Sequence, residues 1–416
     1  MGRRLWVFIH RWAGLALAGF LVVVGLTGSL LAFYPELERL VNPHWYVDRP
    51  PSAWLVPGEL AARLEAAEPR LRVNYLMLQD ADETAKAWVE PRRDAATGKT
   101  PALGYEFVIL DPATGAVLDK GSWGAISRGW RALMSFIYEL HYSLALGMTG
   151  VWILGIAALV WTLDSFIGAY LTFPARRRPP DGGAPDRRKS WFARWEPAWK
   201  IRTRAGSYKL NFDLHRAGGL WLWIMLLIFA WSSVYMNLWD TVYTWTTRAV
   251  MDFRPPWVLI QPLEKPLETP RLDWREAQSR AQAAMQEQAQ QHGYVVHLPV
   301  SLSLDRERGV YRYQVQSSLD IDDRPRRYGA QVYIDADTGA FRHILLPSGQ
   351  YAGNTVSNWL YALHMGNVFG LPYRIFVSFM GLAIVMVSMT GVVIWWKKRK
   401  ARVFIKHASA WHGHDG

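Results

Sequence analysis

The sequence contains no cysteine among its 416 residues. This absence excludes disulfide scaffolds, thiolate zinc sites, iron–sulfur clusters, covalently attached haem and cysteine nucleophiles. No strand-like segment leads into a Gly-x-Gly-x-x-Gly motif, so the fingerprint of a flavin or nicotinamide site is missing too. A metal or redox centre in this chain must therefore use His, Met, carboxylates or a bound cofactor, and its electrons must come from an external donor.

Charge is also scarce over long stretches. The chain has a net charge of +12, yet half of its residues are hydrophobic. Four apolar runs, residues 12–34, 151–173, 217–238 and 375–396, contain one charged residue between them, Asp164. A helix of this length is about 34 Å long and crosses a bilayer. The runs predict four transmembrane helices, and the first is expected to be a retained anchor because it is too long for a signal peptide.

The basic residues indicate the orientation of these helices. Segments 1–11, 174–216 and 397–416 together carry 21 basic and 5 acidic residues, and the remainder carries 26 basic and 30 acidic. By the positive-inside rule, both termini and the 174–216 segment are expected in the cytoplasm. The basic excess then reports topology, and nucleic-acid binding is not expected.

These segments give a domain plan for an integral membrane protein, an α-helical four-helix bundle with two extracytoplasmic α+β domains. The expected parts are transmembrane helix 1 (1–35), periplasmic domain 1 (36–133), an outer short helix with transmembrane helix 2 (134–173), a basic cytoplasmic loop (174–214), transmembrane helix 3 (215–239), periplasmic domain 2 (240–355), an outer short helix with transmembrane helix 4 (356–396) and a basic cytoplasmic tail (397–416).

The plan contains an internal two-fold repeat. The sequence His-Arg-x-x-Gly-Leu occurs at His10 and at His215, and Tyr-x-Leu-His occurs at His141 and at His364. Each extracytoplasmic segment combines a helical pattern (58–67 or 273–290) with strand-like runs, and each ends in Asp-x-x-Thr-Gly, typical of a hairpin turn. The strand-like runs are 74–78, 86–90, 105–110, 299–304, 310–316 and 331–334.

The repeated histidines form one pair at each membrane face. His10 and His215 sit just before outward-running spans and belong to the cytoplasmic side, whereas His141 and His364 sit on short outer helices that end at glycines before the inward-running spans. A histidine within a membrane is costly without a partner. Two imidazoles on facing helices can bind haem iron from both sides in a bundle. Arg11 and Arg216 follow their histidines and are candidates to pair with haem propionates.

A simpler interpretation exists for each residue alone. A single histidine at a membrane interface is usually an amphipathic anchor, and Arg11 and Arg216 can serve as topology charges. The repetition by halves and the pairing by face favour haem ligation for the four histidines, and for the two arginines both interpretations stay open.

The four His-headed spans, the outer Asp-x-x-Thr-Gly turns and the two-half layout resemble the PepSY-associated transmembrane family, over nearly the whole chain. Members of this family are often described as iron-regulated inner-membrane proteins and include bacterial ferric-siderophore reductases. The resemblance implies PepSY-like outer domains, two b-type haems and ligands at His10, His215, His141 and His364. It also implies a multi-pass protein of the bacterial inner membrane.

The expected function is an oxidoreductase that moves electrons from a quinol or a cytoplasmic reductase to a ferric siderophore in the periplasm. Siderophores hold Fe(III) far better than Fe(II), so one-electron reduction releases the iron. Two alternatives remain open, a haem b electron-transfer subunit of a periplasmic oxidoreductase and a haem-free membrane protein whose outer domains bind or inhibit a protein partner.

Overall fold

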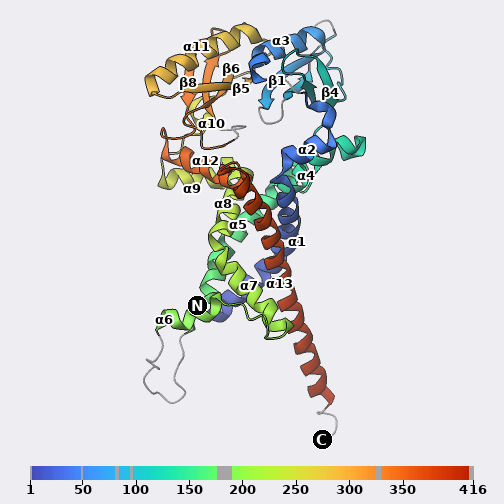
Figure 1. Ribbon diagram of the computed structural model, residues 1–416, viewed down its shortest axis with the longest axis vertical. Coiled ribbons are helices and arrows are strands. Elements are labelled where there is room, and N and C mark those ends of the chain that lie inside the picture. The colour runs from blue at the N-terminus through green and yellow to red at the C-terminus, as the bar shows by residue number, and fades with distance from the viewer. Residues whose placement is uncertain are drawn as a thin grey trace. The chain divides into compact units, whose positions relative to one another are not determined.

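The computed structural model describes residues 2–47, 50–79, 84–93, 97–175, 190–323 and 329–411. The chain forms two compact units, whose elements are labelled in Figure 1. The helical unit comprises Met1–Ala32, Leu140–Trp239 and Ile375–Gly416, and the sheet unit comprises Phe33–Glu139 and Asp240–Arg374.

An eight-stranded antiparallel sheet, in the order β4-β3-β2-β1-β5-β6-β7-β8, is the centre of the sheet unit. Its strands are β1 (Leu71–Gln79), β2 (Thr84–Pro91), β3 (Phe107–Leu110), β4 (Val117–Gly121), β5 (Val296–Asp305), β6 (Val310–Ser317), β7 (Ala330–Asp335) and β8 (Phe341–Leu345). Five of them contain a strand-like run expected from the sequence, and β3 covers the last four residues of the sixth run, 105–110. Strands β4 and β8 were not expected, because each is a short edge strand with a largely exposed face.

The two segments expected as separate domains share this sheet. Strand β1 pairs with β5 through Tyr75↔Ser303, Leu76↔Leu302 and Met77↔Ser301. Helices α3 (Pro57–Ala67) and α11 (Trp274–His292) lie side by side on one face of the sheet (Figure 1), and both halves contribute to one hydrophobic core. The two expected domains are thus one folded unit. The pairing of β1 with β5 removes the free inner edge that each half would expose alone.

The two Asp-x-x-Thr-Gly segments form turns, as expected from the sequence. Asp111 Oδ1 accepts a hydrogen bond from the backbone N–H of Ala113 at 2.8 Å, and Asp335 Oδ1 accepts one from Thr338 at 2.9 Å. The glycines that close these turns, Gly115 and Gly339, have φ of +78° and +72°. Both acidic residues are therefore turn residues, as the repeat predicts.

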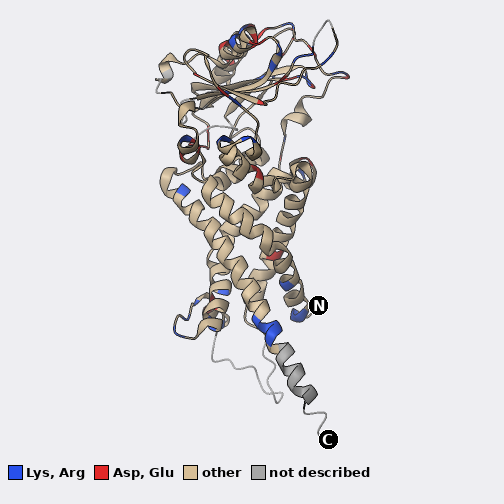
Figure 2. Cartoon of the chain, turned by 90° about the vertical axis from the view of Figure 1, so that its right-hand side faces the viewer, with Lys and Arg blue, Asp and Glu red and all other residues tan. Residues whose placement is uncertain are grey.

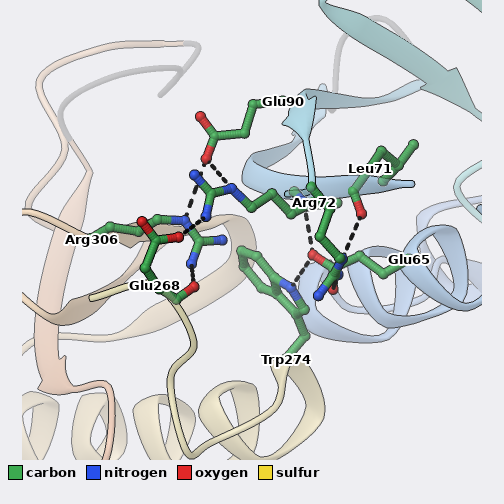
Figure 3. Close-up of polar contacts among 9 residues, drawn as sticks. Glu65, Leu71, Arg72, Glu90, Glu268, Trp274 and Arg306 are labelled. Atoms are coloured by element: carbon green, nitrogen blue, oxygen red, sulfur yellow. Dashed lines mark hydrogen bonds and ion pairs between the residues drawn. The ribbon is translucent and has the colours of Figure 1, made fainter. Parts of the chain in front are cut away.

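A polar network ties the two halves of the sheet unit together (Figure 3). Glu65 on α3 accepts hydrogen bonds from the backbone N–H of Val73 at 2.8 Å, from Arg92 at 2.7 Å and from the indole of Trp274 on α11 at 3.1 Å. Nearby, Arg72 of the first half and Arg306 of the second form ion pairs with the same carboxylate, Glu90, at 2.5 and 3.5 Å. Glu65, itself on α3, thus connects β1, α11 and Arg92, which directly follows β2.

Replacing Glu65 with alanine is expected to destabilise the sheet unit by ~2 kcal/mol, because the Trp274 indole, the Val73 N–H and the Arg92 guanidinium lose their acceptor. Thermal unfolding of the full chain followed by Trp fluorescence measures the effect. Glu287→Ala is the control, because Glu287 is exposed on α11 and bonds only Gln291 among the described contacts. Equal melting temperatures for the two variants would contradict the role given to Glu65.

The sheet unit should lose stability as the pH rises towards neutrality. Burial raises the pKa of Asp322 from 3.8 to about 7, and that of Asp320 to about 6. A carboxyl whose pKa is raised by folding stabilises the folded state at low pH, and this contribution is lost as the pH rises from about 4 through about 7. We expect Asp322→Asn to flatten the decline in melting temperature between pH 4 and pH 8. A decline as steep as that of the unmodified chain would refute the assignment.

Among the residues that the structure describes, the helical unit contains three helices long and apolar enough to cross a membrane, and a fourth span if a bent pair is counted as one. They are α1 (Arg3–Leu31), α5 (Gly147–Thr172), the pair α7 (Ser207–Trp221) and α8 (Trp223–Asn237), and α13 (Gly370–Trp411), whose first residues belong to the sheet unit. In Figure 2 the Lys and Arg positions of this unit, coloured blue, lie mostly in the lower part of the picture, where the N-terminus is marked. The shorter helices and turns of both units are α2 (Tyr34–Val41), η1 (Pro43–Trp45), η2 (Pro51–Ala53), η4 (Ile126–Arg128), η5 (Trp130–Ala132), α4 (Leu133–Ser143), α6 (Trp191–Trp195), η6 (Glu196–Trp199), η7 (Trp239–Tyr243), α9 (Thr244–Val250), α10 (Pro256–Leu259) and α12 (Ala352–Met365).

The third expected span, 215–239, is not one straight helix. It bends by 70° at Leu222, between α7 and α8. Hydrogen bonds hold both sides of the bend, because the indole of Trp221 donates to Trp199 O at 3.1 Å and that of Trp223 donates to Ser165 O at 2.9 Å. The glycine pair at 218 and 219 lowers the cost of the bend. As a result His215 lies within α7 and does not precede the span, and His10 likewise lies within α1.

The break between α4 and α5 depends on glycine, as expected for the short outer helices. Gly147, the first residue of α5, has φ of +57°, and Leu144 and Ala145 before it are also left-handed at +54° and +55°. A Cβ added at Gly150 would stand 1.6 Å from Ser143 O. Only glycine lets the end of α4 lie so close to the first turn of α5.

Candidate functional site

His10 and His215, predicted from the sequence to form a pair, meet inside the helical unit. They lie on α1 and α7, and their ring centroids are 6.1 Å apart with the ring planes inclined at 52°. Both residues are partly buried. The bend after α7 allows this meeting, because it sets the direction of the helix that carries His215.

Each of these imidazoles is held by its Nδ1 atom. The Nδ1 of His10 lies 2.9 and 3.0 Å from the carboxylate oxygens of Asp164 on α5. The Nδ1 of His215 lies 2.9 Å from Val387 O on α13 and 3.3 Å from the hydroxyl of Thr390. These oxygens fix Nδ1 as the protonated donor in both rings, so Nε2 keeps its lone pair. This is the state in which an imidazole binds a metal.

Three of the imidazoles pack against a glycine of a neighbouring helix, and this glycine is the seat of the ring. A Cβ added at Gly168 would lie 3.3 Å from Cε1 of His10, and one added at Gly391 would lie 3.1 Å from Cε1 of His215. His141 has a seat of the same kind, where a Cβ at Gly28 would lie 2.9 Å from its Cε1. A larger residue at these positions would displace the ring, so three of the four predicted ligands rest on a helix surface without side chains.

The His10–His215 pair has dimensions that suit one metal ion between the rings. A metal–imidazole bond is about 2 Å long, so two opposed imidazoles on one ion have ring centres about 6 Å apart. Within the described residues, no group of three or more His, Asp or Glu side chains could hold a metal ion. As a metal site the pair could supply only two ligands, and the others would have to come with a bound cofactor, as they do in a porphyrin.

The two arginines beside this pair differ in their surroundings. Arg216 donates hydrogen bonds to Asp213 at 3.0 Å and to Pro197 O at 2.6 Å. Arg202 forms an ion pair with the same carboxylate, Asp213, at 2.7 Å. The Nε of Arg216 is nevertheless buried without a hydrogen-bond partner among the described residues. Arg11 is partly buried on α1. The unpaired Nε and the excess positive charge around Asp213 leave room for an anionic group here, and the propionate role of both arginines stays a prediction.

The second predicted pair is distributed over the two units. His141 lies on α4 and belongs to the helical unit, where its Nδ1 is 3.0 Å from the hydroxyl of Thr27 on α1. His364 lies on α12 in the sheet unit and is partly buried. Joint ligation by these two residues stays a prediction.

Sequence reasoning missed the residues that hold the rings, above all Asp164. Its signal was visible, because it is the one charged residue in the second apolar run and precedes Gly168 by one helical turn. The missing information was the rotation of α5, which decides that Asp164 faces α1.

The family model of the PepSY-associated TM region matches residues 7–398. The chain belongs to this family. The match includes all four predicted histidines of this PepSY-associated TM protein, both apolar ends and the whole of the intervening sheet unit. It is therefore a membrane protein in which apolar helices accompany an antiparallel, strand-rich sheet. No curated protein matches the sequence.

Proposed function

We propose that this PepSY-associated TM protein is a di-haem b reductase of the bacterial inner membrane that moves electrons across the bilayer to ferric siderophore in the periplasm. One haem would be held by His10 and His215 near the cytoplasmic face, and the other by His141 and His364 near the periplasmic face. The observation that carries the proposal is the His10–His215 pair, with ring centroids 6.1 Å apart and both Nδ1 atoms held by oxygens.

The side chains around the pair perform binding and orientation. Asp164 and Val387 O fix the imidazole tautomers, and Gly168 and Gly391 let the rings approach the helices. Next to each proposed ligand, a Cβ at Gly14 or Gly219 would meet no atom of the described residues within 4 Å, which leaves space one turn from each histidine for a flat ring system. Bound haem would supply reversible one-electron transfer, so no side chain need act as an acid or base.

The proposal includes the topology of the sequence analysis. Four spans, with α7 and α8 as one bent span, would form the bundle, and the two halves would be related as a repeat. The three basic segments would lie in the cytoplasm, and the sheet unit would lie in the periplasm. A quinol or a cytoplasmic reductase would donate the electrons, because the sequence has no flavin or nicotinamide fingerprint.

The test starts with the visible spectrum of the full-length protein purified from haem-replete cells. We expect bands of low-spin b-type haem that shift on reduction. The reduced protein should then be reoxidised by a ferric trihydroxamate chelate alone, with ferrous iron trapped by a chromogenic chelator. A colourless protein would refute the haem assignment and favour the alternative of a haem-free binding protein.

A coloured protein that leaves the ferric chelate unreduced would refute the reductase assignment alone. In that case the electrons would serve a periplasmic oxidoreductase, and reoxidation would require that protein. The two outcomes separate the cofactor from the substrate.

A further inference from the structure

The two histidines of the inner pair have unequal partners. His10 donates its Nδ1 proton to a carboxylate, Asp164, whereas His215 donates to a backbone carbonyl, Val387 O, with the hydroxyl of Thr390 beside it. Asp164 is buried, with 7% of its surface exposed. One ligand therefore has an anionic partner and the other has neutral partners.

The repeat makes this difference specific. Val387 follows Asp164 by 223 residues, which is also the separation of His364 from His141 and of Gly391 from Gly168. The glycine seat is thus present in both halves at the matching position, and the carboxylate is present in the first half only. The support of the ring needs the glycine, and the carboxylate is an addition to it.

A carboxylate inside an apolar span is expensive. A neutral side chain such as asparagine could fix the same imidazole tautomer at lower cost, so orientation alone does not account for Asp164. A carboxylate that accepts the Nδ1 proton increases the electron donation of the imidazole to a metal. Its negative charge also favours the more positive oxidation state of the metal in a medium of low dielectric constant.

We infer that Asp164 is a positioning residue that makes the His10–His215 centre the more reducing of the two centres. This inference rests on the proposed function. At the other centre, His141 is held by the neutral hydroxyl of Thr27. Asp164 would therefore stabilise the ferric form of a haem held by His10 and His215, and an electron placed there would move outward with a favourable free-energy change. The difference between Asp164 in the first half and Val387 in the second would thus set the direction of electron transfer.

The experiment is a potentiometric titration of the full-length protein, followed in the visible bands. We expect two one-electron steps and assign the lower one to the inner centre. Asp164→Asn keeps the size of the side chain and removes its charge. We expect it to shift the ferric–ferrous equilibrium of the lower step about tenfold towards the ferrous form, or about 59 mV upward, and to leave the upper step in place.

Two further variants complete the test. Thr390→Val removes a neutral partner of His215 and should change the equilibrium less than about threefold, since a hydroxyl carries no charge. Asp164→Glu keeps the charge, so its lower step should stay closer to that of the original protein than the step of Asp164→Asn. If Asp164→Asn loses its inner haem, the Glu variant alone decides, and an upward shift of about tenfold in that variant would overturn the inference.

The outcomes separate this inference from the function on which it rests. A colourless original protein would overturn both. A protein with two haem steps, neither of which moves in Asp164→Asn, would overturn the role of Asp164 and leave the haem assignment intact. Equal shifts in Asp164→Asn and Thr390→Val would also overturn it, because the charge would then have no special effect.

Discussion

Replacing His215 with alanine is expected to remove roughly half of the haem bound per protein, because in the proposed di-haem arrangement the inner centre would lose one of its two ligands and the outer centre would keep both. The pyridine haemochrome assay measures this ratio. His10→Ala should have the same effect, because His10 and His215 face each other at 6.1 Å between ring centroids. The double variant should lose no more haem than either single variant.

The control for these variants is His292→Ala, since His292 is exposed at the end of α11 in the sheet unit. It should bind as much haem as the unmodified chain. Full haem content in His215→Ala, with unchanged bands, would show that the pair seen in the helical unit is not a ligand pair.

Replacing Gly391 with leucine should abolish the inner centre while leaving every ligand in the chain. A Cβ at this position already lies 3.1 Å from Cε1 of His215, and the rest of a leucine side chain would occupy the volume of the ring. Overpacking of this kind costs about 1–3 kcal/mol when neighbours can shift, and a metal ligand cannot shift without losing its bond. We expect the haem content of Gly391→Leu to fall as far as that of His215→Ala.

The same substitution at Gly19 provides the matched control. Gly19 lies on α1 and is exposed, and a Cβ added there would have no atom of the described part of the chain within 4 Å. Gly19→Leu should retain the full haem content. If Gly391→Leu also retained it, the seat under His215 would have no part in ligation.

Much of the sheet unit could be predicted from local patterns. Alternating apolar residues located six strands, and the capping box of Asp273 and Glu276 together with Gly293 at φ of +69° defines the ends of α11. The joining of the two halves could not be predicted in this way. The strands bury the same apolar faces in one joined sheet as they would in two separate domains. The alternation of apolar and polar residues along each strand therefore does not distinguish the two arrangements.

The helical unit shows a similar division. The length of the apolar runs and their lack of charge predicted the transmembrane helices. The bend at Leu222 could not be predicted in this way, because it depends on tertiary hydrogen bonds made by Trp221 and Trp223. The repeat predicted that His10 and His215 belong together, and the structure brings them together. The partners Asp164 and Val387 depend on how each helix is rotated about its axis, and a uniformly apolar run carries no signal for that rotation.

The seam between β1 and β5 has a consequence for the order of events during synthesis. Tyr75 and Ser303 belong to one sheet, but α5, α7 and α8 lie between them in the chain. When the ribosome has completed the first half, strand β1 has an unpaired edge and α3 lacks its neighbour α11. The sheet can close only after those later helices have been made, so the first half must wait as an incomplete sheet. A pause or a truncation after residue 239 would leave that edge available to other chains, and misfolding of this protein should begin there.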